Sequence, residues 1–367
     1  MAGRIVLFGA TGFTGELTAR ALVRRGARPL LAARTRERVE ALAADLGGLD
    51  SAVADVSRPR TLAELVERGD VLVSTVGPFA RWGEPAVHAA IGTGAHYIDS
   101  TGEPPFIRTV FERLDREARS AGSGLLTAMG YDYVPGNLAG ALALREAGGR
   151  AVRVDVGYFT SSGTAGQLSG GTRASAAGIF SAPGYAFRSG QLRSERAARH
   201  VRDFELAGRK RAAISVGATE QFTLPRIHPG LRDVGVWLGG FGPASRPLAL
   251  LSGATELVTK LPGVRAAIGA TTSKVVKGSS GGPGATARAQ TRSIVVAIAS
   301  DDAGAPLANA ALEGSNPYDF TAAMLAWSAI QAASGTLRGS GALGPVDGFG
   351  LEALQAGVAE AGITRSP

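Results

Sequence analysis

The stretch that decides the fold is "VLFGATGFTG", residues 6–15. An apolar run typical of a strand ends in three glycines spaced three apart, and a helical pattern follows at once. Such a turn needs one glycine for the sharp bend, one to let pyrophosphate approach the backbone and one for close helix–strand packing. Amide groups and the dipole at the helix start favour an anion there. The alternative is a turn without a ligand, but the pattern favours a dinucleotide held by Gly9, Thr11, Gly12, Phe13, Thr14 and Gly15.

The first 135 residues alternate short apolar runs with helical patterns, as βαβ units do. This predicts an α/β fold with a Rossmann-like, doubly wound parallel sheet. The predicted strands are 4–8, 29–33, 51–54, 71–75, 96–98 and 124–128. The predicted helices are 14–25, 36–46, 61–68, 84–93 and 105–121.

The second strand, "PLLAAR" (29–34), ends in an arginine instead of an acid. NAD sites usually carry Asp or Glu at this point to hold the ribose, whereas a guanidinium pairs with a phosphate in a bidentate fork. Arg34 and Thr35 therefore predict NADP(H). The alternative is that arginines here only cover a solvated helix face. Asp55 and Val56, after the third strand, are expected at the adenine or ribose edge.

The fourth strand leads into "STVGPFARWGEP", residues 74–85. Open α/β sheets bind their ligands at the carboxyl ends of the strands. The backbone there is expected beside the nicotinamide, and Arg81 and Trp82 form either a substrate rim or the start of a helix. The cofactor residues predicted in this stretch are Val76, Gly77, Pro78 and Phe79.

After "YDYVPGNL" (131–138) the pattern changes to strand-like runs at 152–160, 211–218, 233–240 and 291–300. These predict an inserted second α/β domain with a mixed or antiparallel sheet. The helical pattern at 318–333 is expected to pack back on the first domain. The predicted domains are therefore 1–135 with about 315–367, for nucleotide binding, and 136–314, for substrate binding or oligomerisation.

Composition excludes several classes of function. The chain has no cysteine, and its four histidines lack ligand spacing, so no metal site is predicted. Its net charge is +8, but the arginines are scattered and no nucleic-acid motif occurs, so nucleic acid is not a predicted partner. No signal-peptide core or 18-residue apolar run occurs, which predicts a cytoplasmic protein. The basic amphipathic segment 262–277 can serve as a membrane-surface anchor, although a lid or a homodimer contact is favoured.

Four stretches carry a family resemblance: "GATGFTGELTARAL", "LAARTRERVEAL", "TVGPFARWGEPAVHAAIGTGAHYIDSTGE" and "MGYDYVPGNLAG". They resemble the saccharopine dehydrogenase-like family of NADP-binding oxidoreductases, in the bacterial branch that includes the trans-acting enoyl reductases of mycobacterial lipid synthesis. "NPYDFTAAMLAW" and "GALGPVDGFGLEAL" are similar to the same branch. The resemblance implies hydride transfer to a C=N or C=C bond. Residues 130–135 depart from the family's usual Gly-Phe-Asp-Ser-Val-Pro, because two tyrosines replace Phe and Ser.

Hydride transfer leaves a charge that needs a proton or a hydrogen-bond donor. Tyr131, Asp132 and Tyr133 follow the sixth strand and are the predicted catalytic residues, with packing at the domain junction as the alternative for each tyrosine. No Tyr-x-x-x-Lys pair is present, which disfavours ordinary short-chain ketoreduction. Glu103 can orient a substrate or cap a helix.

Thr172 and Arg173, in "SGGTRASA", can bind an anionic group of the substrate, unless the glycine-rich loop before them is only flexible. The sequence as a whole predicts an NADPH-dependent reductase of a small-molecule or acyl intermediate, in specialised or lipid metabolism. The alternative is a regulatory protein that binds NADP(H) without catalysis.

Overall fold

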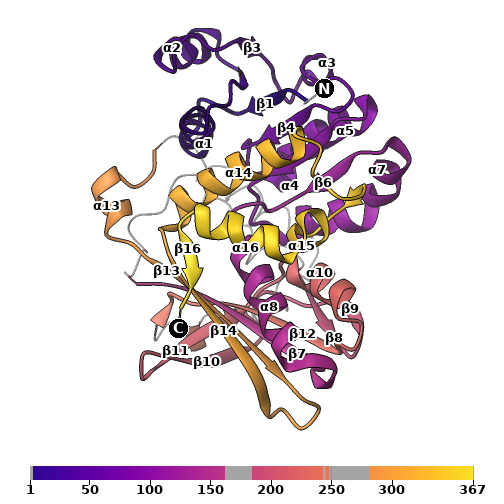
Figure 1. The fold of residues 1–367 in the computed structure, drawn as a ribbon, viewed down its shortest axis with the longest axis vertical. Helices are drawn as coiled ribbons and strands as arrows, with labels where there is room; N and C mark the ends of the chain where they lie inside the picture. Colours follow the sequence, from indigo (N-terminus) through magenta and orange to yellow (C-terminus); the bar gives the residue numbers. More distant parts are fainter. Residues whose placement is uncertain (1–2, 162–183, 243–244, 248, 250–280, 367) are drawn as a thin grey trace, which may run out of the picture. The chain divides into compact units, whose positions relative to one another are not determined.

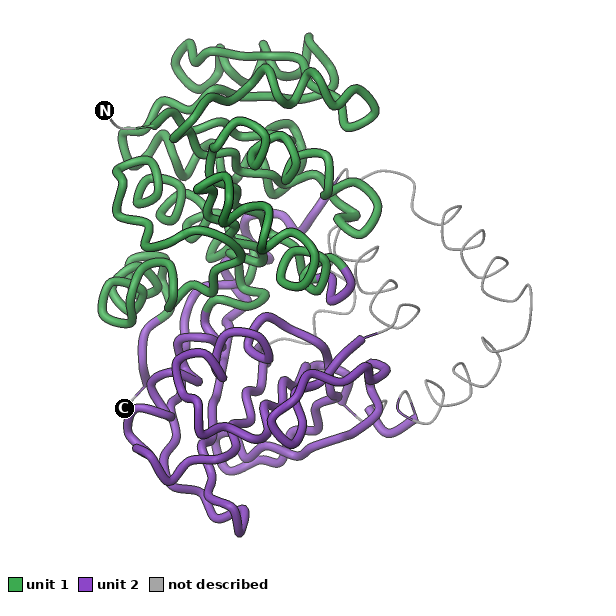
Figure 2. Tube along the Cα trace, turned by 90° about the vertical axis from the view of Figure 1, so that its right-hand side faces the viewer, with its two compact units in different colours: residues 1–102, 106–134, 317–363 green, residues 103–105, 135–316, 364–367 purple. Residues whose placement is uncertain are grey.

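The computed structural model describes residues 3–161, 184–242, 245–247, 249 and 281–366 (Figure 1). The chain divides into two compact units (Figure 2). The first unit contains residues 1–102, 106–134 and 317–363, and the second contains 103–105, 135–316 and 364–367. The domains expected from the sequence place 103–105, 135, 315–316 and 364–367 with the first domain, whereas these residues belong to the second unit.

The sheet of the first unit has seven strands in the described residues, in the order β15-β6-β5-β4-β1-β2-β3. Every neighbouring pair is parallel. The order reverses between β1 and β4, which is the switch point at which such sheets bind ligands. The predicted Rossmann-like sheet is confirmed. Its strands are β1 (Ile5–Phe8), β2 (Leu30–Ala33), β3 (Ser51–Val53), β4 (Val71–Ser74), β5 (His96–Asp99), β6 (Gly124–Leu126) and β15 (Gly341–Ala342).

Helices connect these strands, and two of them differ from the prediction. The expected helix 61–68 is wrong beyond Ala63, because the Asp70 carboxylate accepts the Glu67 amide at 3.0 Å and offers the backbone a non-helical partner. The expected helix 105–121 is interrupted by a π-helix. The elements are α1 (Phe13–Arg24), α2 (Arg36–Asp45), α3 (Arg60–Ala63), α4 (Phe79–Trp82), α5 (Glu84–Thr93), α6 (Pro104–Arg108), the π-helix Thr109–Leu114 and α7 (Asp115–Ala121).

The C-terminal part of the chain completes the first unit. Helix α14 (Pro317–Ala333) packs on α1 and on strands β1, β4 and β5 (Figure 1). Helix α15 (Pro345–Phe349) and helix α16 (Leu351–Glu360) follow, and the Phe349 ring meets the Trp327 ring of α14 edge-on at 4.8 Å. The first unit therefore depends on residues about 200 positions beyond its N-terminal segment.

The second unit is built on a mixed sheet, with nine strands in the described residues. Strands β7 and β12 pair in parallel, whereas β7–β13, β13–β14 and β10–β11 are antiparallel. The predicted mixed sheet is confirmed. The strands are β7 (Arg153–Thr160), β8 (Tyr185–Arg188), β9 (Gln191–Ser194), β10 (Val201–Leu206), β11 (Arg209–Ser215), β12 (Asp233–Leu238), β13 (Ser293–Ser300), β14 (Pro306–Gly314) and β16 (Ile363–Arg365).

Three helices of this region are described: α8 (Val134–Ala147), α10 (Glu220–Ile227) and α13 (Ala285–Ala289). Apolar side chains of the sheet form a core cluster with Phe159, Phe204 and Trp237 at its centre. The basic amphipathic segment 262–277 lies outside the described residues.

Candidate cofactor site and catalytic loop

The glycine loop has the geometry of a phosphate cradle. Gly9 adopts φ +87°, a conformation that favours glycine. A Cβ on Gly15 would lie 2.1 Å from the Gly9 carbonyl oxygen, so helix α1 can approach the strand only with glycine there. Gly12 is the N-cap of α1, and no side chain caps this helix end. The loop therefore presents backbone and a helix N-terminus, as a pyrophosphate site requires.

Strand β4 holds this loop from the other side of the switch point. The Thr75 hydroxyl lies 3.2 Å from the Phe8 carbonyl oxygen and 3.1 Å from that of Gly9. A Cβ on Gly9 would come within 2.7 Å of the same hydroxyl. Thr75 thus fixes the start of the glycine loop, a role that the sequence analysis missed because the partner lies 66 residues away.

The end of β2 carries the arginines expected at a 2′-phosphate. Arg34 and Thr35 are exposed, and Thr35 is the N-cap of α2. The Arg38 guanidinium donates to the Thr11 carbonyl oxygen at 3.2 Å, which brings a second arginine onto the glycine loop. Hydrogen bonds from Ser57, with the nearby charges of Arg58 and Arg34, lower the pKa of the Asp55 carboxyl.

The segment after β4 divides into exposed and buried parts. Val76, Gly77 and Pro78 retain partial exposure. Phe79 is buried, with its ring 5.6 Å from that of Phe106, so its side chain belongs to the core of the unit. The Arg81 guanidinium lies over the Trp82 ring, 4.4 Å from its centre, and both residues sit in the short helix α4.

The three predicted catalytic residues follow β6 and lie near the end of β5. Tyr131 and Tyr133 are buried. The Tyr133 hydroxyl donates toward the Gly102 carbonyl oxygen at 3.4 Å. A Cβ on Gly102 would lie 2.8 Å from Oδ2 of Asp132, so this carboxyl rests directly against a glycine backbone. Burial raises the pKa of the Asp132 carboxyl to about 6, although the residue keeps part of its surface exposed.

Asp99, at the end of β5, is a second buried carboxyl in this region. Its Oδ1 accepts the amides of Thr101 and Ala128 at 2.8 and 2.9 Å, and its Oδ2 accepts the Thr127 hydroxyl at 2.8 Å. Burial raises its pKa to about 6 although these hydrogen bonds oppose the shift. The sequence analysis missed Asp99, since only the neighbouring Glu103 was considered in the same motif.

The assignment of Glu103, Thr172 and Arg173 to the substrate remains a prediction. Glu103 is buried and belongs to the second unit. Thr172 and Arg173 lie outside the described residues. No group of three His, Asp or Glu side chains that could hold a metal ion occurs in the described ranges. Among the same ranges, no helix combines the length and the apolar character needed to cross a membrane.

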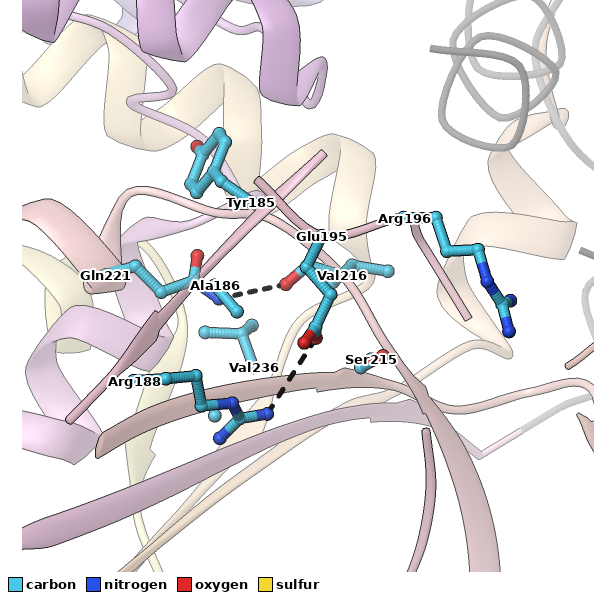
Figure 3. Close-up of a pocket in the computed structure, with 10 residues that line it drawn as sticks. Tyr185, Ala186, Arg188, Glu195, Arg196, Ser215, Val216, Gln221 and Val236 are labelled. Atoms are coloured by element: carbon cyan, nitrogen blue, oxygen red, sulfur yellow. Dashed lines mark hydrogen bonds and ion pairs between the residues drawn. The ribbon is translucent and has the colours of Figure 1, made fainter. Parts of the chain in front are cut away.

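A small cavity lies in the second unit, between strands β8, β11 and β12 (Figure 3). Its lining includes Glu195, whose carboxylate is 4.0 Å from the Arg188 guanidinium, and Gln221. Its volume of about 10 Å³ is enough for roughly one water molecule and too small for an organic substrate.

The sheet order, the glycine loop and the arginines together define the class of this protein as a dinucleotide-binding Rossmann protein. Comparison with known proteins shows what the N-terminal part of the chain is similar to. Residues 5–126 match the family model of the saccharopine dehydrogenase NADP binding domain. The predicted cofactor, NADP(H), and the predicted resemblance to this family are thereby confirmed.

The same region is similar to named mycobacterial proteins. The trans-acting enoyl reductases of Mycobacterium ulcerans and Mycobacterium leprae are 41% and 42% identical over 140 residues, which is 36% of this chain and 34% of each relative. A Mycobacterium tuberculosis protein, provisionally named a trans-acting enoyl reductase, is 44% identical over 142 residues, 36% of this chain and 33% of that protein. The matched region thus spans about a third of each relative's length.

The similarity to a solved structure covers almost the whole chain. Apo saccharopine dehydrogenase (L-Glu forming) from Saccharomyces cerevisiae superposes with a TM-score of 0.60 and 13% identity, covering 99% of each chain. At this identity the match shows the fold alone. The fold class predicted from the sequence is confirmed by this match and by the two sheets.

Proposed function

We propose that this protein is an NADPH-dependent reductase that adds hydrogen across the C=C bond of an enoyl group in an acyl intermediate of lipid metabolism. The observation that carries the proposal is the Asp132 carboxyl, which follows β6 of the same parallel sheet whose β1–α1 loop forms the dinucleotide cradle. The names of the mycobacterial relatives favour C=C over C=N as the reduced bond.

Different residues of the first unit would bind the different parts of NADP(H). Backbone at Gly12 and the start of α1 would hold the pyrophosphate. Arg34 and Arg38 would hold the 2′-phosphate, and Val76 and Gly77 would lie beside the nicotinamide. The bound cofactor supplies the hydride.

Asp132 would supply the proton. A hydride added to the β-carbon of an enoyl thioester leaves negative charge on the α-carbon and the carbonyl oxygen. A protonated carboxyl can deliver its proton to the α-carbon, and proton uptake from water restores it. A pKa of about 6 keeps a useful fraction of this carboxyl protonated near neutral pH. Tyr131 and Tyr133 belong to the same loop as Asp132, and the Tyr133 hydroxyl is directed at the Gly102 carbonyl oxygen.

The decisive experiment offers NADPH deuterated at C4 together with a trans-2-enoyl thioester, and separately with an imine. We expect NADPH oxidation only with the thioester, and a saturated product with deuterium on its β-carbon. Asp132→Asn should lower kcat at least tenfold with an unchanged Kd for NADPH, whereas Arg36→Ala, which removes an exposed pair with Glu40, should change neither. Tight NADPH binding without oxidation by either substrate class would instead favour a regulatory protein.

A further inference from the structure

The loop that carries Asp132, residues 127–133, is held by two side chains from other parts of the chain. One is Asp99 at the end of β5, and the other is Thr321 in the first turns of α14. Neither was identified from the sequence. Both contacts lie inside the first unit.

Asp99 fixes the start of this loop. One of its carboxylate oxygens accepts the Ala128 amide at 2.9 Å, while Ala128 adopts φ +60°, a conformation unfavourable for a residue with a Cβ. The Ala128 carbonyl oxygen in turn accepts the Tyr133 amide at 2.9 Å. The Asp99 carboxylate therefore stabilises a strained turn that brings the far end of the loop back toward its start.

Thr321 fixes the middle of the same loop. Its hydroxyl accepts the Tyr131 amide at 3.0 Å and donates to the Pro317 carbonyl oxygen at 2.7 Å, so the hydroxyl is held in one orientation. A Cβ on Gly130 would lie 2.7 Å from Cγ2 of Thr321, which shows how closely the helix approaches the loop. The anchored amide belongs to the residue immediately before Asp132.

The first turn of α14 also touches the glycine loop. The Tyr318 ring packs edge-on against the Phe13 ring, with 5.3 Å between ring centres. One helical turn thus contacts the loop expected to hold the cofactor and the loop that carries the carboxyl. Because both contacts come from one short rigid segment, the helix fixes the position of one loop relative to the other.

We propose that Asp99 and Thr321 are positioning residues, which hold the Asp132 carboxyl against Gly102 in the orientation that proton transfer needs. The proposal rests on the proposed reductase function. A positioning role differs from a purely structural one in its effect on catalysis. Loss of either contact must lower turnover, and it must do so by disturbing the Asp132 carboxyl. General acids lose efficiency steeply when their geometry is relaxed, so the effect should fall on kcat.

The matched variants are Thr321→Val, which keeps the shape and removes the hydroxyl, and Thr321→Ser, which keeps the hydroxyl. Asp99→Asn removes the acceptor for Thr127 and retains one oxygen for the two amides. We expect amide hydrogen exchange in a peptide covering 127–134 to accelerate at least tenfold in Thr321→Val, and to stay within twofold of the wild type in Thr321→Ser. Exchange in a peptide covering β1 and α1 serves as the control.

Turnover of the enoyl thioester provides the second measurement. We expect kcat to fall about tenfold in Thr321→Val and in Asp99→Asn, with KM for the thioester and Kd for NADPH within twofold of the wild type. In an Asp132→Asn background the same changes should have no further effect on kcat, because they act through that carboxyl.

The outcomes separate the two proposals. Unchanged exchange at 127–134 in Thr321→Val and Asp99→Asn would overturn the positioning roles, whatever the activity. Faster exchange with normal kcat, or a full additional loss in the Asp132→Asn background, would also overturn them. A wild-type protein that binds NADPH and reduces neither substrate class would refute the reductase function and with it the catalytic role of the anchored loop.

Discussion

At the scale of single residues, two aspartates of the first unit show that environment decides the role of a side chain. Asp99 and Asp132 are both shifted to a pKa of about 6 by burial. Asp99 accepts three hydrogen bonds and braces a backbone turn, whereas desolvation alone accounts for the shift of Asp132, which rests against the backbone of Gly102. The first is suited to hold structure, and the second is suited to exchange a proton.

The raised pKa of Asp132 predicts a pH dependence. The acid form is the active donor, so kcat/KM should be level below about pH 6 and fall tenfold per pH unit above it. The folded-state pKa lies above the ordinary value of 3.8, so ionisation costs folded-state stability as pH rises through about 6. Asp132→Asn should therefore be more stable than the wild type at pH 8, by up to about 3 kcal/mol, and not at pH 4.

These effects are measured by pH–rate profiles and by urea unfolding at both pH values. The difference between wild type and variant isolates Asp132, because Asp99 titrates in both proteins. A wild-type rate that stays constant from pH 5 to pH 8, or equal stability of the two proteins at pH 8, would contradict the assignment.

Cofactor choice also belongs to the residue scale. We expect Arg34→Asp to raise Kd for NADPH at least tenfold and Kd for NADH less than threefold, since only NADPH carries the 2′-phosphate that a carboxylate repels. Fluorescence titration with both cofactors measures this, and Arg36→Asp on the exposed face of α2 is the control of equal charge change. Equal losses for both cofactors would show that Arg34 does not contact the phosphate.

At the scale of elements, the β1–α1 turn assigns different tasks to its glycines. A Cβ on Gly15 would lie 2.1 Å from the Gly9 carbonyl oxygen, whereas a Cβ on Gly12 would lie 3.3 Å from the same atom. Helix packing therefore requires glycine at position 15. At position 12 a methyl group would be tight against this oxygen, which would have to shift by a few tenths of an ångström. The methyl group would also occupy the space through which a pyrophosphate approaches the backbone.

This difference predicts two distinct defects. Gly12→Ala should unfold at nearly the wild-type temperature and bind NADPH at least tenfold more weakly. Gly15→Ala should lose about 1–3 kcal/mol of stability through overpacking. Gly92→Ala, on an exposed face of α5 with open space around it, is the control and should stabilise by about 0.5–1 kcal/mol. Thermal unfolding with and without NADPH distinguishes these outcomes, and normal NADPH affinity in Gly12→Ala would place the pyrophosphate elsewhere.

At the scale of the whole molecule, the chain builds two units that each have their own sheet and core. The first unit is assembled from three separate stretches of sequence, so its fold is complete only once residues 317–363 have been added (Figure 2). The second unit is centred on the buried Asp155 of β7. That carboxylate accepts Arg153 at 2.7 Å and the Trp237 indole at 2.8 Å, and it is also paired with Arg202.

A change at Asp155 should therefore affect stability and leave cofactor binding intact. Asp155→Asn removes the charge that two partly buried guanidinium groups require, and should cost about 3 kcal/mol. We expect a lower unfolding midpoint with Kd for NADPH within twofold of the wild type, because every predicted cofactor residue lies in the first unit. Weakened NADPH binding in the folded variant would contradict this separation. Calorimetry and cofactor titration are the measurements.

The sequence by itself determined the first sheet, the glycine loop and the choice of NADP(H). These depend on local patterns, namely apolar periodicity, glycine spacing and the sequence stretches that resemble NADP-binding relatives, while the role of Arg34, which follows β2, remains a prediction. Even in this unit one helix is shorter than expected, because the Asp70 side chain accepts a hydrogen bond from the backbone amide of Glu67.

Tertiary structure alone decided how the glycine loop and the loop that carries Asp132 are held. The hydrogen bonds that hold these loops come from Thr75, Asp99 and Thr321, whose partners lie 66, 29 and 190 positions away. A local sequence pattern cannot predict contacts between residues so far apart in the chain. The burial that raises the pKa of Asp132 likewise exists only once the surrounding elements have packed around its carboxyl.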